Sequence, residues 1–209
     1  MKVIALEGID GAGKSTQAKR LYRVMRGEGL PVALYNYSAK NNPWGRMIKQ
    51  VYAGHPVLKH VKHSRYLQET LYAFSSRANL RALNGEIQPD TVLLADRSIV
   101  TAYASHIDRL PFWFLDVMEA KVRPDLAVFL DIQPEAAAQR ICDRPEKFEE
   151  ELDDLRLFRE GYERVMGKDK PKVLQRTQFL RVNATLPESE LTDIIYKEIR
   201  SAISQKEVR

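Results

Sequence analysis

Short runs of apolar residues alternate along this chain with longer stretches in which apolar residues recur at helical spacing. The apolar runs predict strands at 2–6, 32–37, 91–95, 126–131 and 179–182. The amphipathic stretches predict helices at 14–27, 44–52, 64–83, 99–106, 111–120, 134–142, 149–166 and 187–204. Because strands and helices alternate, the pattern predicts a three-layer α/β/α sandwich around a five-stranded parallel sheet.

Composition narrows the class of protein and of ligand. The chain has 209 residues, of which 44% are apolar and 29% charged, as in an ordinary globular protein of one domain. The net charge is +5, but the basic residues are spread along the chain without an interleaved aromatic motif. This pattern favours small phosphorylated ligands over nucleic acid.

The sequence features that direct proteins to a membrane or to secretion bear on the expected cellular location. No apolar run approaches the ~20 residues that cross a bilayer, so no membrane insertion is expected. We find no signal or transit sequence before the first predicted strand. The single cysteine, Cys142, allows no internal disulfide, and a reducing cytoplasm is the expected location.

A glycine-rich segment, EGIDGAGKST, follows the first predicted strand at residues 7–16. It matches G-x-x-x-x-G-K-[ST] at every fixed position, and an amphipathic helix follows it. Glycines let backbone N–H groups point into one concavity, and the helix N-terminus adds its positive dipole end. Lys14 can then reach the β- and γ-phosphates, and the Ser15 hydroxyl can bind Mg²⁺. The segment predicts a site for a nucleoside triphosphate formed by Gly8, Asp10, Gly11, Ala12, Gly13, Lys14, Ser15 and Thr16.

Two more charged residues follow the predicted strand at 91–95. In P-loop proteins a carboxylate in the position of Asp96 holds Mg²⁺ directly or through water. Arg97 comes next, at the carboxyl edge of the sheet, where open α/β folds bind their ligands. The alternative for Asp96 is that it only caps the next helix.

These motifs resemble those of the thymidylate kinases, a family of P-loop nucleoside monophosphate kinases. The family loop E-G-x-D-G-x-G-K-[ST]-T is reproduced at 7–16, and its strand-terminal D-R at 96–97. Its segment R-P-D-L-x-x-x-L-D-x-x-P-E is reproduced at 123–135, and a lid follows at about 142–149. The resemblance implies one P-loop kinase domain over 1–209 that uses ATP with Mg²⁺ and, as is general in the family, forms a homodimer.

The resemblance also implies roles on the side of the phosphate acceptor. Asp10 would accept a hydrogen bond from the sugar 3′-hydroxyl, and Arg97 would bind the monophosphate of the acceptor nucleotide. Arg77 occupies the place of an arginine that contacts the pyrimidine base. Lys40 lies where many members carry an arginine on the acceptor phosphate.

Position 12 bears on the source of a catalytic cation. Some members have an arginine in the loop, whereas this chain has Ala12, which leaves Lys14 as the cation of the loop. Members without that arginine supply one from the lid, and here the candidates are Arg140 and Arg144. The alternative is that both are solvated surface arginines.

The residues expected around the acceptor base depart from the family pattern. Ala73 replaces the phenylalanine that stacks on thymine, and its neighbour Phe74 lies on an apolar stripe that favours the core. Tyr66 lies on roughly the same helix face as Arg77 and offers an alternative ring. Tyr103 comes two positions earlier than the tyrosine of the family. Tyr66, Phe74 and Tyr103 are therefore the candidate acceptor contacts.

Three functions fit these residues. The leading one is Mg-ATP-dependent phosphorylation of a deoxynucleoside monophosphate, with dTMP converted to dTDP. The second is a kinase of a free deoxynucleoside or another small hydroxyl compound, because such kinases carry an acidic-Arg-Ser triplet that residues 96–98 resemble; Glu7 or Asp96 would then act as the base. The third is a non-catalytic nucleotide-binding regulator, although the sequence has no N-K-x-D guanine motif.

Overall fold

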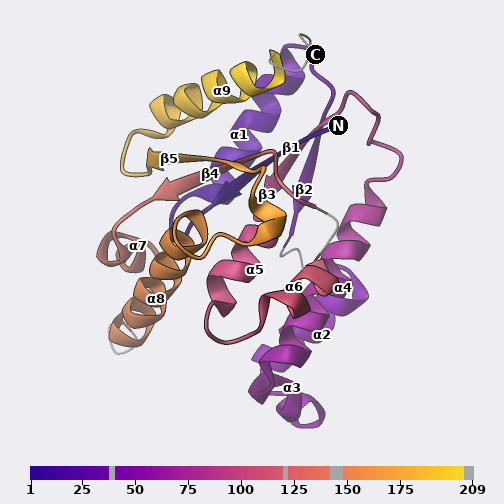
Figure 1. Ribbon diagram of the computed structural model, residues 1–209, viewed down its shortest axis with the longest axis vertical. Helices are drawn as coiled ribbons and strands as arrows, with labels where there is room; N and C mark the ends of the chain where they lie inside the picture. The colour runs from indigo at the N-terminus through magenta and orange to yellow at the C-terminus, as the bar shows by residue number, and fades with distance from the viewer. Residues whose placement is uncertain (38–40, 120–121, 142–147, 205–209) are drawn as a thin grey trace.

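The computed structural model describes residues 1–37, 41–119, 122–141 and 148–204 (Figure 1). Its centre is a sheet of five parallel strands in the order β2-β3-β1-β4-β5. The strands are β1 Lys2–Glu7, β2 Val32–Asn36, β3 Val92–Asp96, β4 Leu126–Asp131 and β5 Gln178–Asn183. The predicted strands are confirmed, with ends shifted by no more than one residue.

Helices fill the connections between the strands. The longer ones are α1 Lys14–Gly27, α2 Pro43–Tyr52, α4 Arg65–Ala82, α5 Ile99–His106, α6 Phe112–Glu119, α7 Pro134–Ile141, α8 Phe148–Met166 and α9 Glu188–Ser204. All of these match the predicted helices. The short helix α3, Lys59–His63, and the 3₁₀ turns Pro56–Leu58 and Lys172–Leu174 were not predicted. Because α3 contains one apolar residue in five, it has no hydrophobic period to detect.

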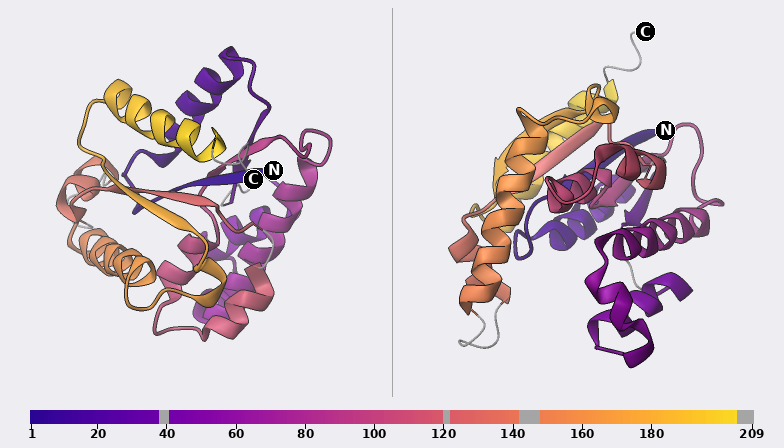
Figure 2. Two further views of the ribbon diagram at one scale, coloured as in Figure 1. Left: turned by 45° about the horizontal axis from the view of Figure 1, so that its top comes forward. Right: turned by 60° about the horizontal axis from the view of Figure 1, so that its bottom comes forward.

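The helices form a layer on each side of the sheet, which confirms the three-layer sandwich (Figure 2). Helices α1 and α9 pack against each other over one face, whereas α4, α5 and α8 lie over the other. Strands β1, β3 and β4 are therefore buried on both sides, which is why they read as continuous apolar runs. Within the described ranges, no helix has the length and apolar content that crossing a membrane requires.

Strand register brings the two sequence motifs together. Strands β1 and β3 are neighbours, and Leu6 pairs with Asp96. On the other side of β1, Glu7 pairs with Phe129 of β4. The glycine-rich loop after β1 and the charged residues after β3 consequently leave the sheet side by side, at the edge where parallel α/β proteins bind ligands.

Candidate active site

The loop between β1 and α1 has a backbone that glycine alone adopts without strain. Gly8 and Gly11 have φ angles of 138° and 80°, in the region that disfavours other residues. A Cβ atom on Gly8 would lie 2.7 Å from the Leu130 carbonyl oxygen, and one on Gly11 would lie 2.7 Å from that of Ala137. The loop is thus packed tightly against the end of β4 and the helix α7.

Lys14 lies at the start of α1, directly above this loop. Its Nζ donates a hydrogen bond of 2.6 Å to the Ile9 carbonyl, and its side chain is buried. Burial and the nearby positive charge of Arg97 together lower the pKa of Lys14 to about 7, against the opposing effect of Asp10. A buried ammonium group beside the backbone N–H groups at the start of a helix forms a site that a bound anion would stabilise.

Ser15 and Asp96 meet beside Lys14. The Ser15 hydroxyl donates to Oδ2 of Asp96 at 2.5 Å, and the amide of Asn36 in β2 donates to the same oxygen at 3.4 Å. A hydroxyl and one carboxylate are the hard oxygen donors that suit Mg²⁺, which takes its other ligands from water and substrate phosphates. These side chains border a cavity of about 280 Å³, lined by Asp10, Gly11, Gly13, Lys14, Ser15, Thr16, Asn36, Asp96 and Arg97.

Arg97 has a strained backbone and a buried side chain. Its φ angle is 70°, and 8% of the residue is exposed. One guanidinium nitrogen donates to the Gly8 carbonyl at 3.0 Å and to the Tyr162 hydroxyl at 3.1 Å, while the other pairs with Asp10. The guanidinium also lies 5.3 Å from the ring centre of Phe158 in α8. Packing and hydrogen bonds together fix this arginine at the tip of β3.

Glu7 supports the arginine from below. Its carboxylate accepts hydrogen bonds from Ser98 at 2.6 Å, Thr101 at 2.7 Å and Tyr162 at 3.0 Å. Burial raises the pKa of Glu7, while these hydroxyls and Arg97 act to lower it. Glu7 lines neither cavity described here. Its hydrogen bonds therefore serve the protein framework around Arg97.

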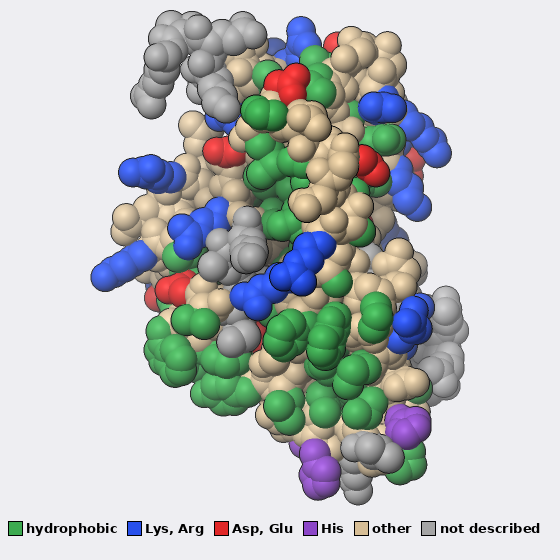
Figure 3. All heavy atoms as spheres, turned by 90° about the vertical axis from the view of Figure 1, so that its right-hand side faces the viewer, with side chains coloured by type: hydrophobic (Ala, Val, Ile, Leu, Met, Phe, Trp, Pro, Cys, Tyr) green, Lys and Arg blue, Asp and Glu red, His purple; other side chains and the backbone are tan. Residues whose placement is uncertain are grey.

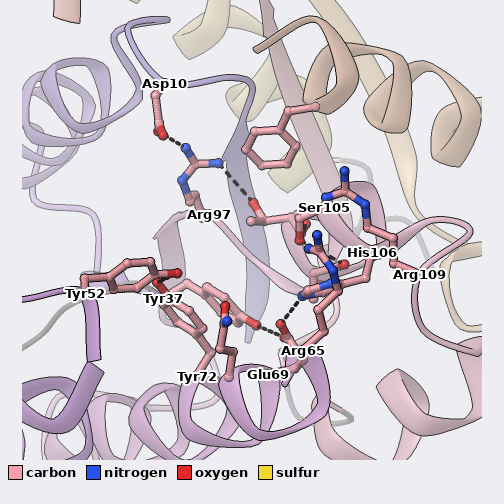
Figure 4. A pocket seen from close by; sticks show the side chains of 14 residues that line it. Asp10, Tyr37, Tyr52, Arg65, Glu69, Tyr72, Arg97, Ser105, His106 and Arg109 are labelled. Atoms are coloured by element: carbon pink, nitrogen blue, oxygen red, sulfur yellow. Dashed lines mark hydrogen bonds and ion pairs between the residues drawn. The ribbon is translucent and has the colours of Figure 1, made fainter. Parts of the chain in front are cut away.

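A second cavity, of about 410 Å³, opens between α4 and α5 on the far side of Arg97. Its walls are formed by Asp10, Tyr37, Tyr52, Arg65, Gln68, Glu69, Tyr72, Arg97, Thr101, Ala102, Ser105, His106, Arg109 and Phe158. In Figure 4, Arg97 and Asp10 face each other at one end, and Glu69 and His106 face each other at the opposite end. Two ligand-sized spaces thus meet at the same pair of residues, Asp10 and Arg97.

Known proteins share this pattern of motifs. A family model described as thymidylate kinase matches residues 6–193, which include the loop, both cavities and helix α8. The chain belongs to the thymidylate kinase family. Membership makes the protein a phosphotransferase that acts on nucleoside monophosphates.

Individual relatives carry the same name at low identity. A probable thymidylate kinase of Methanosphaera stadtmanae is 28% identical, with 96% of each chain covered. One of Thermoplasma acidophilum is also 28% identical, over 83% of this chain and 92% of its own. A thymidylate kinase of Desulfotalea psychrophila is 32% identical over 67% of this chain and 68% of its own.

In this member of the thymidylate kinase family, several residues that were expected to contact the acceptor nucleotide do not line the cavity between α4 and α5. Tyr66 is 48% exposed and packs edge-on against Phe114, whereas Phe74 is 39% exposed and stacks on Trp44 at 4.8 Å. The expectation that Phe74 belongs to the core is wrong, because its ring lies at the surface against Trp44, although Leu71 of the same stripe is buried. Arg77 donates to the Val117 carbonyl at 3.2 Å, on the same outer side.

Tyr103 is also directed away from the cavity. It is fully buried, and its hydroxyl donates to Asp116 of α6. Thr101 and Ser105, one helical turn apart on α5, line the cavity instead. The early position of the tyrosine in the sequence therefore corresponds to a different face of the helix.

Helix α7 directly precedes the predicted lid. Arg140, near the end of α7, donates to the Gly11 carbonyl at 3.1 Å and is therefore next to the phosphate loop. Arg144 and most of the predicted lid lie outside the described residues, as does Lys40. Their predicted roles stay predictions.

The sequence did not lead us to the residues that line the cavity between α4 and α5 away from Arg97. Arg65, Gln68, Glu69 and Tyr72 come from α4, and His106 and Arg109 from the end of α5 and the loop after it. The α4 residues recur at i, i+3, i+4 and i+7, which is the signature of one helix face. A polar stripe at that spacing was the available signal.

Proposed function

We propose that this protein transfers the γ-phosphoryl group of Mg-ATP to a deoxynucleoside monophosphate, with dTMP as the acceptor and dTDP as the product. The observation that carries this proposal is that Asp10 and Arg97 border both cavities. A triphosphate over the loop and a monophosphate between α4 and α5 would bring their phosphates together at Arg97. The names of the relatives support thymidylate as the acceptor.

On the donor side, we assign the triphosphate to the backbone N–H groups of residues 8–16 and to Lys14. Arg140 lies close enough to Gly11 to contact the donor. Ser15 and Asp96 would hold Mg²⁺, which when bound neutralises the donor phosphates. Because the side chain of Lys14 is buried, a donor phosphate that replaces the Ile9 carbonyl as its partner would be bound close to the ammonium group.

On the acceptor side, Arg97 would bind the monophosphate, and Asp10 would accept a hydrogen bond from the sugar. An acceptor phosphate oxygen attacks the γ-phosphorus, the bond from the γ-phosphorus to the bridging oxygen breaks, and ADP leaves with that electron pair. The cations surround the transferring group and hold the two nucleotides in line, which is the main contribution of protein in phosphoryl transfer. We keep Lys40 and Arg144 as further proposed contacts to the acceptor and the transferring phosphate.

The chemistry of the acceptor separates this function from phosphorylation of a free nucleoside. A monophosphate is already ionised near neutral pH, since its second pKa is about 6, so it needs no general base. A 5′-hydroxyl needs one. Glu7 is occupied by three hydroxyl groups and lines neither cavity, which argues against it as that base.

An acceptor panel tests the proposal. The full chain with Mg-ATP is given dTMP, dUMP, dCMP, dAMP, dGMP or thymidine, and product nucleotides are measured by chromatography. We expect the highest kcat/KM with dTMP. Faster turnover of thymidine would favour the nucleoside kinase, and ATP binding without transfer to any member would favour the regulator.

We also propose that the protein forms a homodimer through an aromatic patch on α2, α4 and α6. The patch consists of Trp44, Tyr66, Leu67, Phe74, Trp113 and Val117, all of them exposed. Figure 3 shows hydrophobic side chains gathered on the lower part of this face. Exposed aromatic clusters of this kind are typical of protein interfaces, and the outward face of α4 makes the patch continuous from α2 to α6.

A further inference from the structure

A carboxylate is buried in the wall of the acceptor cavity, at the end opposite Arg97. Glu69 is 3% exposed and lies on the inner face of α4. Its Oε1 accepts a hydrogen bond of 3.3 Å from the Tyr37 hydroxyl, and its Oε2 lies 2.6 Å from Nε2 of His106. Figure 4 shows this pair bridging α4 and α5 across the cavity.

Packing gives no reason for a carboxylate at this position. Removing an ionised group from water costs several kcal/mol, and apolar residues at such a contact are often as stable or more stable. Helix α4 nevertheless turns a polar stripe with Arg65, Gln68 and Tyr72 toward the cavity, whereas Tyr66 and Phe74 lie on its outer side. A buried carboxylate–imidazole pair in the wall of a ligand cavity indicates a role in recognition.

His106 is arranged to orient Glu69. Its Nε2 faces the carboxylate and therefore donates the hydrogen bond, and its Nδ1 is buried with no hydrogen-bond partner in the described part of the chain. Tyr37 fixes the other oxygen. A carboxylate has about four acceptor sites, and these two partners leave the remaining ones to a ligand.

We propose that Glu69 reads the acceptor base by accepting a hydrogen bond from its N3–H group. This rests on the proposed function, in which the phosphate of the acceptor is at Arg97 and its base extends into the cavity. A thymine edge presents a carbonyl, an N–H and a second carbonyl. Donors beside Glu69 complement the two carbonyls, since the Gln68 amide and the Arg65 and Arg109 guanidiniums line the same cavity. A cytosine would instead direct its N3 lone pair at the carboxylate.

The test compares dTMP with its N3-methyl analogue, which lacks the N–H. Binding of each to the full chain is measured by calorimetry, and kcat/KM is measured with Mg-ATP. A hydrogen bond to a charged group corresponds to an affinity difference of roughly 10- to 100-fold, so we expect the wild type to prefer dTMP by that factor. In Glu69→Ala the preference should fall below about 3-fold, because the partner of the N–H is gone.

Two milder variants keep the test decisive if Glu69→Ala folds poorly. Glu69→Gln keeps the size and one carbonyl acceptor, and we expect a loss of dTMP affinity of about 3- to 10-fold. Tyr37→Phe removes one group that orients Glu69 and should weaken dTMP binding by a smaller factor. Its matched control is Tyr35→Phe, a buried tyrosine of β2 whose hydroxyl bonds Ser76 and does not line the cavity.

The outcomes separate this inference from the proposed function. Undiminished discrimination against the N3-methyl analogue in both Glu69 variants would overturn the inference, even with normal turnover of dTMP. Tighter binding of dCMP than of dTMP by the wild type would also overturn it. Glu69-dependent discrimination in binding, without any phosphoryl transfer, would support the inference and contradict the proposed function.

Discussion

Gly11 shows at the scale of one residue how the loop is held in its shape. Its φ angle of 80° and the Ala137 carbonyl, 2.7 Å from where a Cβ would lie, leave no room for a side chain. We predict that Gly11→Ala costs about 1–3 kcal/mol of stability through strain and weakens ATP binding more than dTMP binding. Thermal unfolding and calorimetry measure both effects.

The matched control is Gly27→Ala at the end of α1, where the φ angle is not positive and the added Cβ meets nothing within 4 Å. This substitution should be neutral or slightly stabilising, because alanine restricts the unfolded chain more than glycine does. Equal destabilisation by the two substitutions would contradict the account of the loop.

Lys14 contributes its charge rather than its packing. We predict that Lys14→Ala lowers kcat/KM for ATP by about 10²–10³-fold, the usual cost of removing one group that stabilises developing charge. A coupled assay of ADP release measures it. Lys19, exposed on the same helix, provides the control, and Lys19→Ala should keep wild-type activity. Similar losses from both lysines would point to general electrostatic attraction of the nucleotide.

At the scale of elements, helix α8 follows the predicted lid and reaches Arg97, which borders the proposed acceptor site. Its residue Tyr162 donates to Glu7 and receives a hydrogen bond from Arg97, while its ring packs between Phe129 and Phe158. Tyr162→Phe keeps the ring and removes the hydroxyl. We predict a decrease in kcat/KM for the acceptor of about 10-fold, from the lost hydrogen bond to a charged group, with KM for ATP little changed.

The control is Tyr196→Phe, whose hydroxyl bonds Glu28 at the surface and lies outside both cavities. Steady-state kinetics at saturating ATP distinguishes the two variants. If Tyr162→Phe raised KM for ATP as much as it affected the acceptor, the hydroxyl would have a general structural role.

The same substitution has a predicted pH signature. Burial raises the pKa of Glu7, and the Tyr162 hydroxyl acts against that shift. Without the hydroxyl, the pKa in the folded state rises further above its value in the unfolded chain. An acid with a raised folded pKa destabilises the fold when ionised, and this cost disappears as the pH falls below the unfolded pKa. Tyr162→Phe should therefore lose more stability at pH 8 than at pH 4, measured by denaturant titration.

The strands and the glycine-rich loop were predictable because each has a signal in its own stretch of sequence. The strands buried on both faces read as apolar runs, and Gly8 through Ser15 matched a motif whose backbone shape requires its glycines. The residues that line the acceptor cavity could not be predicted in this way, because the face that a helix turns toward a cavity depends on tertiary packing. Phe74 and Tyr66 were on the expected helix, but α4 turns them toward α2 and α6, while Glu69 faces the cavity.

At the scale of the molecule, we expect helix α4 to couple two surfaces, because it lines the acceptor cavity on one side and carries part of the exposed patch on the other. A helix usually buries its apolar face and exposes its polar one. Helix α4 turns polar residues toward the acceptor cavity and carries Tyr66, Leu67 and Phe74 outside. Association of two copies would cover that outer face and hold α4 firmly against the cavity, so assembly and acceptor binding should be coupled.

We predict that Trp113→Glu separates the dimer, since Trp113 is 66% exposed at the edge of the patch and a carboxylate there would be desolvated on association. Sedimentation velocity should show twice the monomer mass for the wild type and the monomer mass for the variant. Val24→Glu, at an exposed apolar residue of α1 away from the patch, is the control and should remain dimeric. Because the variant loosens α4, KM for dTMP should rise while KM for ATP stays the same. A wild type that sediments as a monomer at all concentrations would contradict the proposed interface.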